Sequence, residues 1–420
     1  MTALHATRQL VLRTLAASVL IAILSTQAFN VSAGPREQAK RIHDRIAGVP
    51  PSAEVLDDMA GLIENSSDPV GAAEIALKNP AFYDVTLKNF VAPWTNESMS
   101  PFVPLNDYTA TVIGIIRDTG ITNVDFRDVL TGNIVYKGAS NLDIAAHSNR
   151  NNNHYEQLEN SGNSLSDPDV LEATTQSSMN PELPPGATAG VMTTRAAAKA
   201  FFSAGTNRAM FRFTLLNHMC NDLEQVADVS LPPDRIRQDV SRSPGGDSRV
   251  FLNNCVGCHT GMDPMTQAFA YYDYEYDGDI ETGRLIYNAT GETGDTSQVT
   301  NTRVMPKYHI NGTTFEQGYL TPNDGWDNYW RAGANRRLGW DTNSMGLTGS
   351  GNGAKSLGKE FANSEAFAHC QVKKVFRNVC LREPGNSDDR AAVSNIVTVF
   401  KQGYDLKDVF AETAAYCKGA

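Results

Sequence analysis

Apolar side chains follow a helical spacing through the first hundred residues after position 34. They recur every three to four positions in two runs, Ala39, Ile42 and Ile46, then Val55, Met59, Leu62 and Ile63. This spacing predicts two helices, and Pro50-Pro51 separates them. The apolar segment Tyr108–Arg117 also favours a helix. We therefore expect a helical N-terminal domain over residues 34–136, without a cofactor motif.

The helical spacing is lost over residues 137–189. This stretch is rich in Asn, Ser, Asp, Glu and Pro, which predicts a polar linker or a long solvated loop. His147 and His154 lie in it. A surface metal site is one interpretation of the two histidines, and exposed polar side chains in a loop are the commoner one.

Two further regions complete a mostly α chain. Residues 190–226 return to a helical pattern, and the Gly-, Asn- and Asp-rich stretch that follows residue 263 predicts long irregular loops with short helices. We expect residues 190–355 to form one domain. Residues 356–420 predict a three-helix module packed on that domain, with helices near 357–380, 388–402 and 406–417.

The N-terminus has the layout of a secretory signal peptide over residues 1–33. Arg8 and Arg13 precede the apolar run 15–24, and small residues lead to Ala33. Cleavage after Ala28 is an alternative, and so is an uncleaved anchor, although the run is short for a membrane span. No later segment is apolar enough to span a membrane. We therefore expect a periplasmic or secreted protein.

Charge excludes one class of partner. The chain has a formal net charge of -11, and loss of the two arginines of the signal leaves -13. An acidic surface repels nucleic acid, whereas it can be attracted to basic patches on a redox partner protein. The oligomeric state does not follow from the sequence.

The stretch "FLNNCVGCHTGMDP" carries the candidate chemistry. Cys255, Cys258 and His259 form the pattern C-x-x-C-H, which is typical of covalent attachment of haem c. The two thiols add to the vinyl groups of one haem, and the adjacent imidazole binds its iron. A structural zinc site would need a second close ligand pair, and a thioredoxin-like site would need a βαβ setting. A plain disulfide is the third alternative.

The sixth ligand of the iron is a separate question. Met305, 46 residues after His259, is our candidate, because methionine gives a six-coordinate electron-transfer haem. Met305 as core filler is the competing interpretation. An empty sixth position would instead favour a haem enzyme of peroxidase or oxidase type. The other candidates are His218, Met219, His309, Met345 and His369.

Some residues near the motif admit two interpretations. The aromatic residues Trp326, Tyr329, Trp330 and Trp340 would pack on the haem or form ordinary core. Arg331, Arg336 and Arg337 would pair with haem propionates or lie in solvent. The acidic run that begins at Asp273 matches the first half of a calcium loop, but its twelfth position is Arg284 rather than glutamate.

Four cysteines lie outside the motif, and an oxidising compartment favours their pairing. Cys370 and Cys380 would lie about 15 Å apart on one continuous helix, which exceeds the reach of a disulfide. In an up-down-up module the helix ends near Cys380 and Cys417 meet. We therefore favour Cys380–Cys417 and Cys220–Cys370, with free buried thiols as the alternative.

Two long segments resemble a known family. They read "GVMTTRAAAKAFFSAGTNRAMFRFTLLNHMC" and "FLNNCVGCHTGMDPMTQAFAYYDYEYDG". They are similar to the haem module of planctomycete-type cytochromes, which have a helix ending in cysteine, C-x-x-C-H, Asp-Pro and an "AF…D…G" run. The C-terminal "FANSEAFAHCQVKKVFRNVCLREP" resembles the small helical module of these proteins. The resemblance implies one covalent haem c, export and a cytochrome c-like helical haem domain over residues 190–355, but no substrate.

The sequence therefore predicts an exported mono-haem c-type cytochrome that transfers single electrons between redox partners. Two alternatives stay open. One is a haem enzyme with an open sixth coordination site, and the other is an electron-delivery subunit of a neighbouring enzyme.

Overall fold

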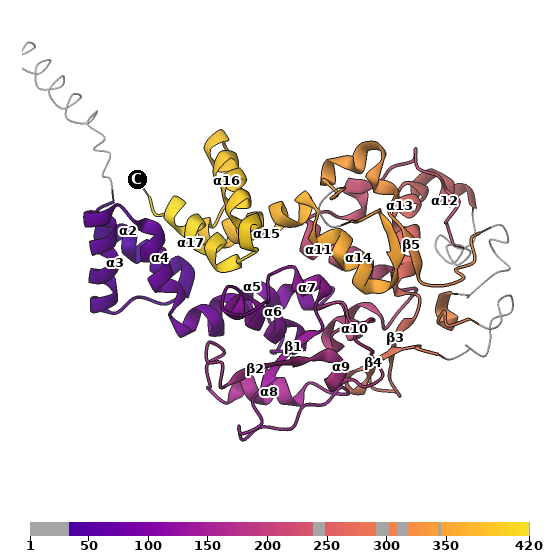
Figure 1. Cartoon of the computed structure of the whole chain (residues 1–420), viewed down its shortest axis with the longest axis horizontal. Coiled ribbons are helices and arrows are strands. Elements are labelled where there is room, and N and C mark those ends of the chain that lie inside the picture. The colour runs from indigo at the N-terminus through magenta and orange to yellow at the C-terminus, as the bar shows by residue number, and fades with distance from the viewer. Residues whose placement is uncertain (1–32, 238–247, 291–301, 309–317, 343–345, 420) are drawn as a thin grey trace, which may run out of the picture.

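The fold is mostly helical, as the sequence predicts. A computed structural model of the chain (Figure 1) describes residues 33–237, 248–290, 302–308, 318–342 and 346–419. Apart from Ala33, the expected signal segment lies outside these ranges. No helix in the described ranges has the length and apolarity needed to cross a membrane.

The α-helices fall into three stretches of the chain. The first stretch holds α2 (Pro35–Ala47), α3 (Ala53–Ser66), α4 (Pro69–Leu77), α5 (Lys88–Val91), α6 (Asp107–Asp118) and α7 (Asp128–Thr131). The second holds α8 (Asn153–Asn160), α9 (Gln176–Met179), α10 (Arg195–Phe201), α11 (Arg208–Met219), α12 (Ser248–Asn254) and α13 (Val256–Thr266). The third holds α14 (Gly353–Ala362), α15 (Glu365–Cys380), α16 (Ser387–Gly403) and α17 (Leu406–Tyr416).

Short helical turns and small sheets connect these helices. The turns are η1 (Phe82–Leu87), η2 (Ala92–Thr95), η3 (Leu223–Val226), η5 (Gln267–Phe269), η6 (Ile280–Thr282), η7 (Pro306–Tyr308), η8 (Tyr329–Arg331) and η9 (Gly333–Leu338). Three antiparallel strand pairs join β1 (Ile134–Gly138) with β2 (Leu171–Thr175), β3 (Tyr272–Glu275) with β4 (Arg284–Tyr287), and β5 (Gly325–Asp327) with β6 (Ser350–Asn352).

The N-terminal helices form where the apolar spacing predicts them. Pro50-Pro51 lies between α2 and α3, and the Ser52 hydroxyl accepts a hydrogen bond from the Val55 N–H at 3.2 Å to cap α3. The predicted segment Tyr108–Arg117 lies within α6 and is buried along its whole length. Because α6 is buried on every side, it is a central helix rather than a surface one.

The C-terminal helices join the two ends of the molecule. In Figure 1, α2–α4 lie at one end of the long axis and α12 and α13 at the other. Helix α17 packs on α4, whereas α14 packs on α7 and α15 on α11. One continuous core contains residues of all these helices except α12, whose Phe251 lies in a separate small cluster. The module at 356–420 therefore packs on the N-terminal helices as well as on residues 190–355, and region 34–136 shares its core with the rest.

The segment 137–189 differs from the expected polar linker. It contributes β2, α8 and α9, and Tyr155, Leu158 and Leu171 are buried in the main core. Its core residues, which also include Leu165, Val170, Leu183, Ala187 and Ala189, follow no helical or strand period, which is why the composition alone predicts a loop. His154 is buried rather than exposed. Its Nε2 accepts from the Gly138 N–H at 2.9 Å, and its Nδ1 pairs with the Ala145 carbonyl at 2.7 Å.

The C-terminal module contains one break that the pattern does not predict. The helix expected over 357–380 divides into α14 and α15, because the Ser364 hydroxyl caps a new helix by accepting from the Phe367 N–H at 3.1 Å. Cys370 and Cys380 still share one helix, so the argument against their pairing holds. The disulfides are Cys220–Cys370 and Cys380–Cys417, which confirms the favoured connectivity.

Candidate haem site

The attachment motif begins helix α13. Cys255 precedes the helix, and its carbonyl accepts hydrogen bonds from the N–H groups of Cys258 and His259, each at 3.2 Å. These bonds close the first turn. Residues three and four positions apart share one face of a helix. Cys258 and His259 therefore lie on the side of α13 that continues from Cys255.

The two motif cysteines differ from the other four. Cys255 and Cys258 are unpaired and half-buried, whereas the remaining cysteines form the two disulfides. The Cys258 thiol donates to the Leu223 carbonyl at 3.5 Å. Burial raises the pKa of Cys258, and the nearby charges of Glu224 and Asp222 act in the same direction. This thiol is therefore protonated at neutral pH, unlike the acidic thiol of a dithiol redox motif.

Asp263 holds the imidazole of His259. The His259 Nδ1 donates to the Asp263 Oδ2 at 3.0 Å, which leaves Nε2 as the ring nitrogen for a ligand. Asp263 lies one helical turn after His259 and is fully buried, whereas the His259 side chain is 17% exposed. The arrangement is the one usual for metal-binding histidines, whose second nitrogen donates to a carboxylate or carbonyl.

Two arginines surround the Asp263 carboxylate. The Arg208 Nε donates to Oδ1 at 2.9 Å and its Nη2 to Oδ2 at 3.2 Å, while the backbone N–H of Arg237 approaches Oδ2 at 3.4 Å. Burial acts to raise the pKa of Asp263, but Arg208, His259 and Arg237 outweigh it and hold the pKa well below its usual range. Asp263 is therefore a buried carboxylate anion.

In the sequence, Asp263 stands out only as part of an Asp-Pro pair. The signal that would have identified its role is the i, i+4 spacing of His259 and Asp263 on a helix. Arg208 and Arg237 carry no such signal, because each reaches Asp263 from a different part of the chain.

A close approach at Gly261 fixes α13 against the core. A β-carbon at this position would lie 1.9 Å from the Nε1 of Trp330, so only glycine fits there. Trp330 is fully buried, and its ring lies 5.8 Å from that of Phe211 on α11. The ring of Phe251 meets the imidazole of His259 edge to face at 5.1 Å. The helix is thus held between an indole and a phenyl ring.

Of the aromatic and arginine residues considered beside the motif, the tryptophans fall in the core, whereas Arg336 and Arg337 are exposed. Trp326, Trp330 and Trp340 belong to the main core. Arg331 forms a bidentate pair with the buried Glu360, at 2.7 and 2.8 Å. Arg337 donates to the Gln225 carbonyl at 2.8 Å, and Gln225 lies in η3 with the Leu223 that Cys258 contacts. Arg337 therefore contacts the same short turn, η3, as the thiol of Cys258 does.

Met305 lies apart from His259. Its N–H donates to the Ala270 carbonyl at 2.8 Å, and its side chain packs in a small cluster with Tyr271, Val304 and Tyr308. Ala270 follows His259 by eleven residues, which is about 16 Å of helix. The structure thus brings Cys255, Cys258 and His259 together but does not bring Met305 to them.

The remaining candidates for the sixth ligand have other partners or lie outside the described residues. The His218 Nε2 pairs with the Tyr108 hydroxyl at 3.1 Å in the core, and the Met219 sulfur accepts from the Ser364 hydroxyl at 3.3 Å. His369 lies on α15, within the C-terminal module. His309 and Met345 lie outside the described residues.

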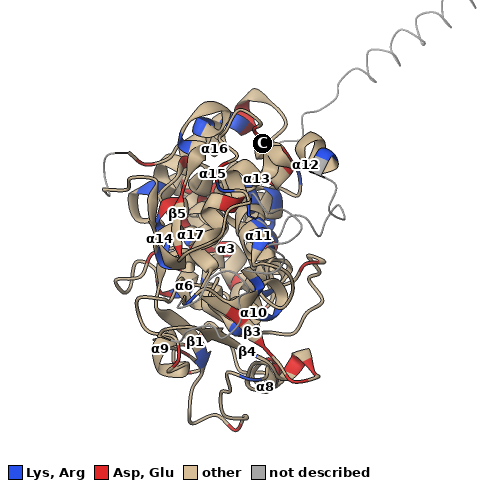
Figure 2. Ribbon diagram, turned by 90° about the vertical axis from the view of Figure 1, so that its right-hand side faces the viewer, with Lys and Arg blue, Asp and Glu red and all other residues tan. Residues whose placement is uncertain are grey.

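The acidic run at β3 and β4 is paired with cations. Arg284 bonds Glu275 at 3.0 Å, and Lys307 bonds Asp273 at 2.6 Å. In Figure 2 several acidic positions, coloured red, lie along the ribbon of this strand pair. Within the described residues, no group of three or more His, Cys, Asp or Glu side chains is placed to hold a metal ion together.

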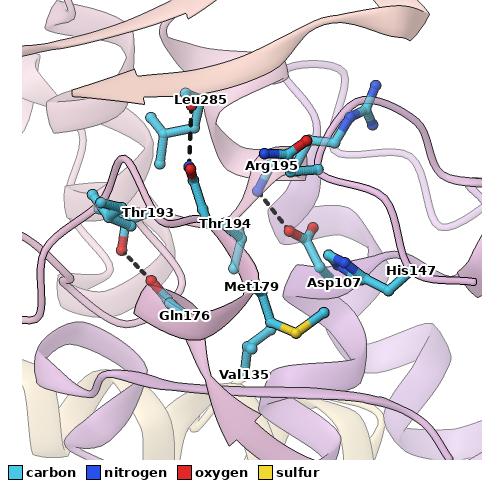
Figure 3. A pocket seen from close by; sticks show the side chains of 12 residues that line it. Asp107, Val135, His147, Gln176, Met179, Thr193, Thr194, Arg195 and Leu285 are labelled. Atoms are coloured by element: carbon cyan, nitrogen blue, oxygen red, sulfur yellow. Dashed lines mark hydrogen bonds between the residues drawn. The ribbon is translucent and has the colours of Figure 1, made fainter. Parts of the chain in front are cut away.

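A second buried aspartate, Asp107, lines a small cavity beside the start of α10 (Figure 3). The cavity has a volume of about 40 Å³ and is lined by Asp107, His147 and Arg195 among others, which is room for about three water molecules. Asp107 accepts from the N–H groups of Arg195 at 2.6 Å and Ala196 at 3.0 Å. This carboxylate caps α10 and has no side-chain partner of the kind that Asp263 has.

Comparisons with known proteins place this chain in no family. No protein-family model matches it, and neither a curated protein nor a solved structure has a significant match to it.

Proposed function

We propose that the protein is an exported mono-haem c-type cytochrome that passes single electrons between redox partner proteins. In this proposal the thiols of Cys255 and Cys258 would add across the two vinyl groups of one haem, with each S–H proton ending on a vinyl carbon. The Nε2 of His259 would hold the iron. The haem supplies one-electron exchange between ferric and ferrous iron.

One observation carries the proposal. Four of the six cysteines are joined in disulfides, while Cys255 and Cys258 stay unpaired on the first turn of α13, beside a histidine that Asp263 holds by its other nitrogen. Free thiols, an adjacent imidazole and an exposed edge are what haem c attachment needs. The donor set of this chain therefore fits the group.

The rival interpretations of the motif fit less well. A zinc site lacks a second ligand pair among the described residues. A dithiol redox site would need a βαβ setting, whereas helices α12 and α13 flank this motif. Export is part of the proposal, because haem attachment of this kind requires translocation. The signal-like segment 1–33 and the two disulfides support it.

The decisive test uses the full-length chain, expressed with its signal segment in a host that attaches haem c. The purified protein should gain the mass of one haem and give the pyridine-haemochrome spectrum of a doubly thioether-linked haem. Replacement of both motif cysteines, C255A/C258A, should remove the haem. The matched variant C380A/C417A should keep it, because that pair forms a disulfide remote from His259. A wild-type protein without covalent haem would refute the proposal.

A second candidate is a haem enzyme with an exchangeable sixth ligand. It is favoured by the carboxylate partner of His259 and by the position of Met305 away from the motif. Binding of cyanide to the ferric form and of CO to the ferrous form would support this candidate. Spectra unchanged by either ligand would support electron transfer alone.

A further inference from the structure

We propose that Asp263 and Arg208 act as a pair that sets the reduction potential of the haem by controlling how strongly His259 donates to the iron. The inference rests on the proposed haem function. Asp263 is a positioning residue in it, since it acts through His259.

The geometry connects the three side chains in series. The His259 Nδ1 lies 3.0 Å from Asp263 Oδ2, and Arg208 Nη2 lies 3.2 Å from that same oxygen. The Arg208 Nε holds the other oxygen at 2.9 Å. The imidazole and the guanidinium therefore compete for one carboxylate, which has no exposed surface.

The expected electronic effect has a definite sign. A carboxylate that accepts from Nδ1 makes Nε2 more basic, and a more basic ligand stabilises ferric over ferrous iron. Asp263 therefore lowers the reduction potential. Arg208 opposes it in two ways, because it withdraws charge from the carboxylate and because a cation near the iron favours the ferrous form.

The helix α11 carries a natural control for this pair. Arg212, one turn after Arg208, forms a similar two-bonded pair with Asp222, at 2.8 and 2.6 Å. The side chains of Arg212 and Asp222 are 47% and 30% exposed, and the Asp222 carboxylate bonds Arg212 and the N–H of Leu223 rather than a histidine. Removing the charge of Asp222 changes the field near the motif without touching the ring of His259, and solvent screens much of that change.

The experiment is potentiometric titration of the haem-loaded, full-length protein. D263N should raise the reduction potential, because an amide is a weaker acceptor and carries no charge. R208Q should lower the potential, R208K should stay near the wild type, and D222N should shift it less than D263N does. Intact mass and near-UV circular dichroism confirm attachment and folding in each variant.

Opposite shifts in D263N and R208Q would support the inference. It would be overturned if D263N moved the potential no further than D222N, or if R208Q raised it. If D263N does not retain haem, the comparison of R208Q with R208K decides alone, because both leave Asp263 bonded to His259. A wild-type chain without covalent haem would refute the proposed function itself, whereas a haem protein with unmoved potentials would refute only this inference.

Discussion

Two of the buried aspartates, Asp263 and Asp107, have the same kinds of neighbours but opposite electrostatics. Asp263 lies on α13 between His259 and Arg208, and Asp107 lies beside Arg195 and His147 near α10. Burial acts to raise the pKa of both carboxyl groups. The effect of burial dominates for Asp107, whose pKa is raised because the backbone N–H groups of Ala196 and Arg195 offset burial only in part. The pKa of Asp263 is instead lowered, because two arginines and the imidazole outweigh burial.

This difference shows how to separate a structural carboxylate from a functional one. The oxygens of Asp107 bond the N–H groups that begin α10, and the Arg195 guanidinium donates to the Gly283 carbonyl at 2.9 Å and to the Tyr274 hydroxyl at 3.2 Å. Those groups hold the fold together. The carboxylate of Asp263 instead orients a partly exposed imidazole, so its charge acts on a side chain that can bind a ligand.

The largest expected effect is on haem content. C255A/C258A should abolish covalent haem, because no thioether bond can form, while D107N and H147Q should each retain one haem per chain. Pyridine-haemochrome absorbance against protein concentration measures this. Loss of haem in D107N at full folding would contradict the separation of the two aspartates.

The next effect is on stability. D263N should lower the free energy of unfolding of the chain by about 3–5 kcal/mol, since it leaves buried arginine charge without its anion. Urea denaturation followed by far-UV circular dichroism gives the value. A loss below 1 kcal/mol would show that Arg208 finds another anion and would weaken the contrast with Asp107.

D107N should cost less, about 1–2 kcal/mol. The amide keeps one acceptor oxygen for the start of α10 and removes a charge whose burial is unfavourable. The same denaturation assay applies, and D222N is the surface control. If D107N destabilised the chain more than D263N, the bonds of Asp107 to the start of α10 would contribute more to the free energy of unfolding than the ion pair of Asp263. That result would contradict the expected order of the two effects.

The smallest effect concerns pH. Burial lowers the pKa of His147 from 6.5 to about 4, with His154 and Lys137 contributing. The unfolded chain therefore binds a proton at higher pH than the folded chain does, so wild-type stability falls as the pH drops from 6.5 toward 4. H147Q should show a shallower fall over this window. An identical pH dependence in H147Q and the wild type would show that His147 is neutral or charged alike in both states.

Much of the fold follows from local patterns, and the exceptions have physical reasons. The helices near Ala39, Val55 and Tyr108 form as their apolar spacing predicts, because each buries one face or more. The composition of segment 137–189 predicts a linker, because its core residues, such as Leu158, follow no period. The break between α14 and α15 depends on a single capping residue, Ser364. The sequence does not reveal this break, because the apolar spacing is helical on both sides of it.

The sequence by itself determined the haem hypothesis, the mostly helical fold and the cysteine pairing. These depend on residue types at short fixed spacings or on helix geometry, and both can be read directly from the sequence. Only the tertiary structure decided that Arg208 and Arg237 surround the Asp263 carboxylate. It also decided that Met305 lies apart from His259 and that Asp107 bonds the first N–H groups of α10. Each of these facts depends on contacts between residues distant in the chain, which packing of the whole core brings about.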